Sequence, residues 1–120
     1  MKKKVKKLYL QEKKRALKKI VGIYSKPRLS VFRSHKHIYA QLIDDQYGKT
    51  LEACSTVDKR ISSSLENTAN QEAAFVVGAE LAKRALAKEI TSIIFDRGDR
   101  PYHGRIKSLA EGARKEGLIF

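Results

Sequence analysis

The stretch LSVFRSHKHIYAQLI, from Leu29 to Ile43, decides the fold of this chain of 120 residues. Its two halves, residues 29–33 and 37–43, are rich in β-branched and aromatic residues and flank a short polar segment, which is the pattern of a β-hairpin. A two-residue turn at His35 and Lys36 sets the register of the two strands. The resulting pairs are Arg33 with Ile38, Phe32 with Tyr39, Val31 with Ala40 and Leu29 with Leu42.

This register sorts the side chains of the hairpin by face, because successive residues of a strand point to opposite sides. The apolar face, which we expect to join the core, carries Leu29, Val31, Ile38, Ala40 and Leu42. The other face carries Ser30, Phe32, His37, Tyr39 and Gln41. Exposed aromatic rings beside a basic turn are suited to stacking on unpaired nucleic-acid bases. An equally good interpretation is a cross-strand aromatic pair that only stabilises the hairpin.

Beyond a turn at residues 44–48, the segment Thr50–Ser55 predicts a third strand with Leu51 and Ala53 facing inward. A polar segment follows, with a short helical turn near Ile61–Leu65. The clearest helix is Gln71–Lys88, in which small and apolar residues recur at helical spacing. That stripe, which should allow close approach to a sheet, consists of Ala74, Val77, Gly78, Leu81, Ala82 and Ala85.

Asn70 is a suitable N-cap for this helix. The chain then continues into a short buried strand, Ser92–Phe95, and a second amphipathic helix, Arg105–Glu116, which Gly117 ends. Because the last strand is reached through a helix, it should run parallel to a strand already in the sheet. The order predicts one α/β domain, a two-layer sandwich with a mixed four-stranded sheet made of an antiparallel meander and one parallel strand.

The charge of the chain is concentrated in its first third. Residues 1–36 hold fourteen Lys and Arg against one acidic residue and so carry the whole net charge of +13, whereas residues 37–120 hold twelve of each sign. We therefore predict a basic helical arm over residues 1–25 and a globular domain over residues 26–120. Such asymmetry indicates an arm that binds nucleic acid or another anionic surface.

RNA is the favoured partner of the arm, because basic segments follow the phosphates of nucleic acids. A solvated charged helix and a helix lying on a membrane surface are the two alternatives, and the lack of Trp and Phe anchors disfavours the second. The candidate phosphate contacts in the arm are Lys2, Lys3, Lys4, Lys6, Lys7, Lys13, Lys14, Arg15, Lys18 and Lys19.

The segment FDRGDRPYHGR, Phe95 to Arg105, is the densest functional candidate outside the arm. Its arginines offer planar donors for phosphate oxygens, and the helix that it opens favours anions at its amino terminus. Tyr102 and His103 can stack on bases or bond to ribose. An ordinary loop held by ion pairs is the competing interpretation.

The residues needed for catalysis or metal binding are not found in the required patterns. No spacing of Cys and His suits zinc, and no phosphate-binding loop or nucleophile elbow is present. Cys54 should behave as a small apolar residue of a strand. The acidic residues of Asp44–Asp45 and of Asp96…Asp99 are better explained by turns and structural ion pairs than by a metal site. We expect a protein that is not an enzyme and has no cofactor.

Four segments together resemble the bacterial-type large-subunit ribosomal protein number eighteen, the family that binds 5S rRNA. They are KPRLSVFRSHKHIYAQ from Lys26, CSTVD from Cys54, ANQEAAFVVGAELAKRAL from Ala69 and FDRGDRPYHGRIKSLAEGARKEGL from Phe95. The resemblance implies a ribonuclease H-like topology, with the meander strands in the order three-two-one and the last strand beside the first. Ribonuclease H-like nuclease chemistry is not implied, because the first strand lacks a carboxylate.

The resemblance also implies a function and a set of contacts. The protein would attach 5S rRNA to 23S rRNA in the central protuberance, beside neighbouring large-subunit proteins, in a bacterial cytoplasm or a plastid stroma. A generic basic RNA-binding module is the alternative. Besides the arm, and with Tyr39 added from the hairpin pattern, the expected RNA-binding residues are Arg28, Arg33, Lys36, His37, Tyr39, Ser55, Thr56, Arg97, Tyr102, His103 and Arg105.

Overall fold

The structure, a computed structural model, describes residues 20–98 and 101–120 of the chain. Strands β1 (Arg28–Arg33) and β2 (Ile38–Asp44) form the antiparallel hairpin. Their register contains every predicted pair, from Arg33 with Ile38 at the turn to Leu29 with Leu42 at the far end. The prediction of the hairpin is therefore confirmed, because the alternation of apolar and polar residues permits only this register.

Strand β3 (Lys49–Ser55) continues the meander, but its inward residues differ from the prediction. The register with β2 shifts between Leu42 and Ile43, so that Leu51 becomes an extra residue of the ladder. A bulge of this kind interrupts the alternation of faces. Leu51 packs against the core as predicted, whereas Ala53 is exposed and Cys54 is buried. The inward placement of Ala53 was wrong for this reason.

Strand β4 (Ile94–Asp96) lies parallel to β1 and completes a sheet in the order β3-β2-β1-β4. The mixed four-stranded sheet is confirmed, and its strand order is the one that the resemblance implied. The predicted strand began too early, at Ser92. That residue forms an isolated parallel bridge with Ile119, so the C-terminal residues run beside the chain just before β4.

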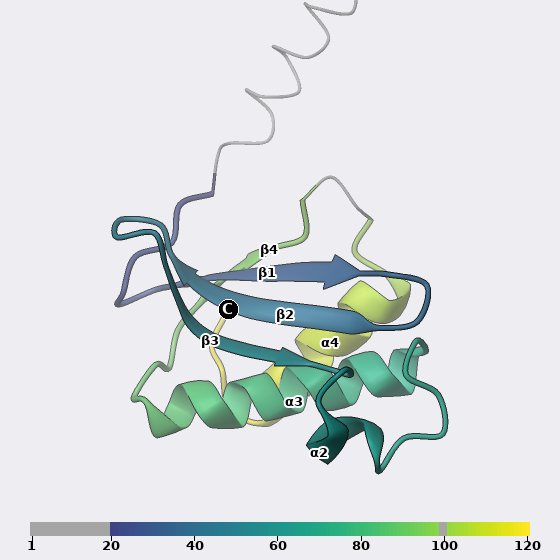
Figure 1. Ribbon diagram of the computed structural model, residues 1–120. Helices are drawn as coiled ribbons and strands as arrows, with labels where there is room; N and C mark the ends of the chain where they lie inside the picture. Colours follow the sequence, from purple (N-terminus) through teal and green to yellow (C-terminus); the bar gives the residue numbers. More distant parts are fainter. Residues whose placement is uncertain (1–19, 99–100) are drawn as a thin grey trace, which may run out of the picture.

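Helices α3 (Gln71–Ala87) and α4 (Gly104–Lys115) cover one face of the sheet, which gives two layers (Figure 1). The Asn70 side chain accepts a hydrogen bond of 2.9 Å from the Ala73 amide and so caps α3 as predicted. The short helix α2 (Lys59–Ser62) begins two residues before the predicted helical turn. The core between the layers contains Leu29, Ile38, Leu42, Val77, Leu81, Ile93 and Leu109.

The two long helices approach each other closely at a pair of glycines. A Cβ atom on Gly78 of α3 would overlap the backbone carbonyl oxygen of Leu109, and one on Gly112 of α4 would overlap that of Phe75. We had expected the small residues of α3 to allow contact with the sheet. At Gly78 this was wrong, because its surface meets α4 instead. In the part of the chain that the structure describes, no helix is long and apolar enough to cross a membrane.

Candidate nucleic-acid interface

The face of the sheet opposite the helices carries the aromatic residues of the hairpin. The Phe32 and Tyr39 rings lie 5.5 Å apart between centroids, and the His37 ring meets Tyr39 edge-on at 6.4 Å. Phe32 nevertheless keeps 58% of its surface exposed. Beside these rings a shallow depression is lined by Ser30, Phe32, Tyr39 and Gln41. The cross-strand pair therefore exists, and it also leaves ring surface on which a base can stack.

The turn end of this face is organised by Thr56. Its hydroxyl oxygen is fully buried, accepts a hydrogen bond of 3.0 Å from the Ile38 amide and lies 3.1 Å from Nδ1 of His37. Thr56 was expected to contact RNA, and its hydroxyl is engaged inside the protein. It orients the ring of His37, which is itself half-buried. Arg33 and Lys36 are exposed beside this ring, and Ser55 is half-buried.

Arg28 is held at the centre of an ion-pair network. Its guanidinium donates two hydrogen bonds of 3.0 Å to the Asp45 carboxylate and a third, also 3.0 Å, to Asp96. The Asp45 carboxylate also accepts a bond of 2.6 Å from the Gly22 amide. The hydrogen bond to Asp45 raises the pKa of Arg28. Asp96 forms a structural ion pair as expected, but its partner is Arg28 on the neighbouring strand β1 and not the adjacent Arg97.

This network joins three segments that are distant in sequence. Gly22 lies within the last residues of the segment predicted as the arm, Asp45 lies in the turn after β2, and Asp96 ends β4. Gly22 is required here, because a Cβ atom would overlap the backbone nitrogen of Arg28 and lie too near the Ile43 carbonyl. Sequence reasoning missed both Gly22 and the role of Asp45, since nothing local to either residue indicates a partner so far along the chain.

Replacing Arg28 with methionine is expected to lower the free energy of unfolding by about 2 kcal/mol, because two carboxylates lose their cation. Water reaches a fifth of the Arg28 side chain, which keeps the loss below that of a fully buried pair. Urea denaturation followed by circular dichroism measures this change. Arg97→Met, on an exposed arginine, is the matched control and should leave the midpoint unchanged. Equal stability of the two variants would contradict the structural role of Arg28.

The loop between β4 and α4 is anchored on aromatic residues at its base. The Tyr102 ring meets Phe95 edge-on at 5.9 Å, and its hydroxyl accepts a hydrogen bond of 2.8 Å from Arg114. Phe120 also stacks on Phe95, with ring centroids 5.6 Å apart, and the Arg114 guanidinium lies 4.3 Å above the Phe120 ring. The C-terminal residue thus supports the loop, which no sequence pattern indicated.

The basic residues of this loop have different surroundings. Arg97 is exposed, and His103, at the N-cap position of α4, makes no capping hydrogen bond. Arg105 is half-buried and donates a bond of 3.1 Å to the Ala69 carbonyl. Gly98 and Gly104 have φ values of +65° and +61°, which glycine adopts without strain. Arg105 is thus tied to the domain, whereas Arg97 stands at the surface.

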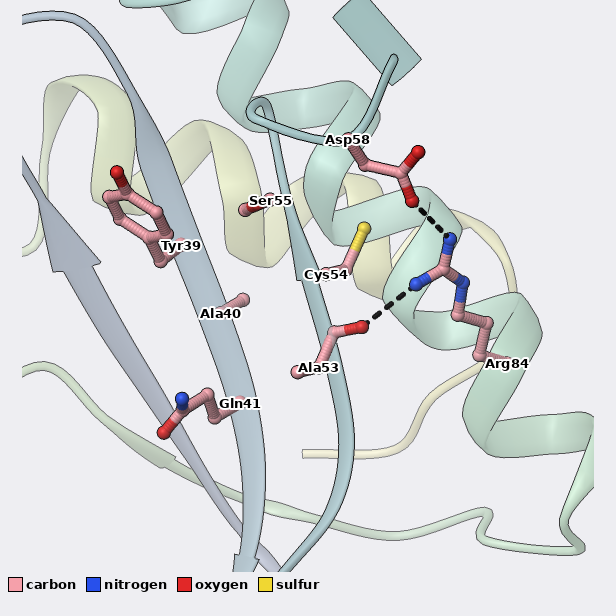
Figure 2. Close-up of a pocket in the computed structure, with 8 residues that line it drawn as sticks. All are labelled: Tyr39, Ala40, Gln41, Ala53, Cys54, Ser55, Asp58 and Arg84. Atoms are coloured by element: carbon pink, nitrogen blue, oxygen red, sulfur yellow. Dashed lines mark hydrogen bonds and ion pairs between the residues drawn. The ribbon is translucent and has the colours of Figure 1, made fainter. Parts of the chain in front are cut away.

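A small pocket lies between β2, β3 and α3 (Figure 2). Burial raises the pKa of the Cys54 thiol to about 12, so the thiol stays protonated at neutral pH. Cys54 is thus a small apolar residue of a strand, as the sequence predicted, and the structure buries it. Hydrogen bonds from Arg60 hold the pKa of Asp58 well below its usual range.

Within residues 20–98 and 101–120, no three His, Cys, Asp or Glu residues gather as a metal site would require.

The predicted contacts of the arm lie outside the described residues. They are Lys2, Lys3, Lys4, Lys6, Lys7, Lys13, Lys14, Arg15, Lys18 and Lys19. The described chain begins beside the domain, where Ile23 and Lys26 exchange backbone hydrogen bonds of 3.2 and 3.0 Å. The division between arm and domain at residue 25 stays a prediction.

Comparisons with known proteins identify related sequences along nearly the whole chain. The family described as ribosomal L18 of archaea, bacteria, mitochondria and chloroplast matches residues 2–120. Large ribosomal subunit protein uL18 of Thermotoga petrophila is 52% identical over 111 residues, which cover 92% of this chain and 91% of that protein. Protein uL18c of Guillardia theta is 56% identical over 102 residues, 85% and 95% of the two chains. Protein uL18 of Citrifermentans bemidjiense is 53% identical over 111 residues, 92% and 91% of the two chains.

Proposed function

Because this chain belongs to the L18 family of large-subunit ribosomal proteins, we propose that it binds 5S rRNA and helps to attach it to 23S rRNA in the central protuberance. It acts as a structural component of the ribosome, beside neighbouring large-subunit proteins, and catalyses no reaction. The observation that carries the proposal is the placement of the whole net charge of +13 in residues 1–36, ahead of residues 37–120, which carry no net charge. Such a segment neutralises phosphates, and the domain adds a shaped surface.

The described residues divide into two proposed roles. Exposed cations at the hairpin turn and at the β4–α4 loop contact phosphates directly, and the open aromatic face stacks on unpaired bases. The residues in these direct roles are Arg33, Lys36, His37, Tyr39, Arg97 and His103. The others keep that surface in shape through internal bonds, and they are Arg28, Thr56, Tyr102 and Arg105. Ser55, which is half-buried at the end of β3, is assigned to neither of these two roles.

A gel-shift comparison of 5S rRNA with transfer RNA tests this function. At equal salt concentration we expect binding to 5S rRNA to be tighter, because charge alone attracts both RNAs equally and only a shaped surface separates them. Unlabelled transfer RNA should then compete poorly for the complex. Equal affinity for the two RNAs would reduce the protein to a generic basic RNA-binding module.

Arg97 and Arg105 should respond differently to replacement by alanine. We expect Arg97→Ala to weaken 5S rRNA binding about tenfold with no change in melting temperature, because removing one charge-assisted bond to a phosphate costs roughly 1–2 kcal/mol. Arg105→Ala should lower both the affinity for 5S rRNA and the melting temperature, since the bond from Arg105 to the Ala69 carbonyl ties α4 to the chain before α3. Filter binding and thermal denaturation on the same samples measure the two effects. A fall in melting temperature for Arg97→Ala with unchanged affinity would contradict its role.

A further inference from the structure

Strand β3 forms one edge of the sheet, and its outward backbone groups are occupied by side chains. Nη1 of Arg84 donates a hydrogen bond of 2.8 Å to the Ala53 carbonyl (Figure 2), and Nζ of Lys88 donates one of 2.6 Å to the Leu51 carbonyl. The Ala53 amide donates a weak bond of 3.4 Å to Oε1 of Glu52. Both backbone groups of Ala53 on the open side of the strand are thus already bonded.

The side chains that occupy this edge are themselves held in place. Arg84 lies in the last turn of α3, and Lys88, four residues further on, is the C-cap residue of that helix. Residues at this spacing lie on the same side of a helix, so both side chains reach the same strand. The Arg84 guanidinium lies 3.3 Å from Glu80 and 3.3 Å from Asp58, and the Lys88 ammonium lies 3.2 Å from the Glu52 carboxylate. The Arg84 side chain is only 21% exposed. These contacts hold the Arg84 and Lys88 donor groups in position against the strand.

Near the other edge of the sheet, at β4, backbone groups bond to other backbone groups. The C-terminal residues run beside the chain before β4, where the Ile93 amide donates to the Ile119 carbonyl at 3.1 Å and the Ile119 amide donates to the Thr91 carbonyl at 2.9 Å. Backbone therefore covers the chain just before β4, whereas side chains cover β3.

We propose that Arg84, Lys88 and Glu52 prevent a second copy of this chain from adding its own β3 to the sheet. An exposed edge strand offers unpaired N–H and C=O groups to any other strand, and inward-bonded charged side chains are one way to block that pairing. At the centre of β3, Glu52 is paired with Lys88, and the residues beside it, Leu51, Ala53 and Cys54, are uncharged. With the block removed, two copies associate through antiparallel β3 strands about a two-fold axis.

The double variant Arg84→Met/Lys88→Met tests the proposal on the full chain. Methionine keeps the length of the side chains and removes their donors. Sedimentation velocity is measured at about 100 µM protein, where partly exposed edges associate, and at about 0.5 M salt, which screens repulsion between the basic segments. We expect the wild type to sediment as a monomer and the double variant to approach twice that mass. Lys59→Met/Lys83→Met, which changes two exposed lysines and the same net charge, should stay monomeric.

Adding Ala53→Pro to the double variant should restore the monomer, because proline removes the outward N–H at the centre of the edge. If circular dichroism shows the double variant unfolded, Lys88→Met alone decides, since that side chain is half exposed and its loss disturbs the core less. A folded variant that stays monomeric overturns the proposal. Association that Ala53→Pro does not reverse also overturns it, as does a loss of 5S rRNA affinity without association.

Discussion

Replacing Gly78 with alanine is expected to lower the free energy of unfolding by about 3 kcal/mol, the upper end for an overpacked core. The added Cβ would overlap the backbone carbonyl oxygen of Leu109, and a backbone atom inside a helix cannot turn aside as a side chain can. Alanine gains only about 1 kcal/mol over glycine in a helix interior, so the net effect remains a loss. The same reasoning applies to Gly112 against Phe75.

Urea denaturation followed by circular dichroism measures this loss. Lys83→Ala is the matched control, because it introduces the same residue on an exposed position of α3 and should leave the unfolding midpoint nearly unchanged. If Gly78→Ala proves as stable as the wild type, α3 and α4 can move slightly apart without loss of stability. The glycine pair then does not determine the distance between the helices. Retention of helical content together with a lower midpoint is the result that the packing predicts.

Deleting residues 2–19 should weaken binding to 5S rRNA at least about a hundredfold at moderate salt and flatten its salt dependence. This segment carries ten Lys and Arg residues, and each phosphate that is no longer neutralised reduces the slope of log affinity against log salt by roughly 0.9. The melting temperature should change little, because the buried core of the described residues runs from Leu29 to Leu118. The deletion thus separates RNA affinity from stability.

Filter binding between about 50 and 200 mM salt measures the slope, over a range in which neutralising about six to ten phosphates makes affinity fall by roughly 10³–10⁵. A chain whose first 19 residues are shuffled keeps the charge and serves as the control, since counterion release does not depend on the order of the lysines. We expect the shuffled chain to retain most of the slope. An unchanged slope after the deletion would show that the arm neutralises few phosphates.

The hairpin and the helix cap were predictable because both depend on residues that are neighbours in sequence. Arg33 and Ile38 are joined by one short turn, and the alternation of apolar side chains fixes how the strands slide against each other. Asn70 caps α3 through the amide of Ala73, three residues ahead. The candidate interface was predictable to the same extent: the sequence singled out the hairpin turn and the β4–α4 loop from composition, and both lie at the surface.

The departures arise where a residue meets a distant segment. The bulge at Leu51, which turned Ala53 outward, depends on the pairing of β3 with β2. Arg28, predicted to bind RNA, is bonded to Asp45 and Asp96, and Phe120 supports Tyr102 through Phe95. Contacts between distant segments produce no periodic pattern in the local sequence, so these partners could not be predicted from any single segment.

Local sequence was enough to establish which segments become strands and helices, which face of the hairpin is apolar, and where the positive charge lies. These properties follow from periodicity, turn residues and composition, which act within a few residues of each position. It took the packed molecule to show that Gly78 meets α4, that Arg28 joins the turn after β2 to the end of β4, and that Arg84 bonds to the edge of β3. Those contacts depend on how the finished elements pack, because packing brings together atoms that the chain separates by tens of residues.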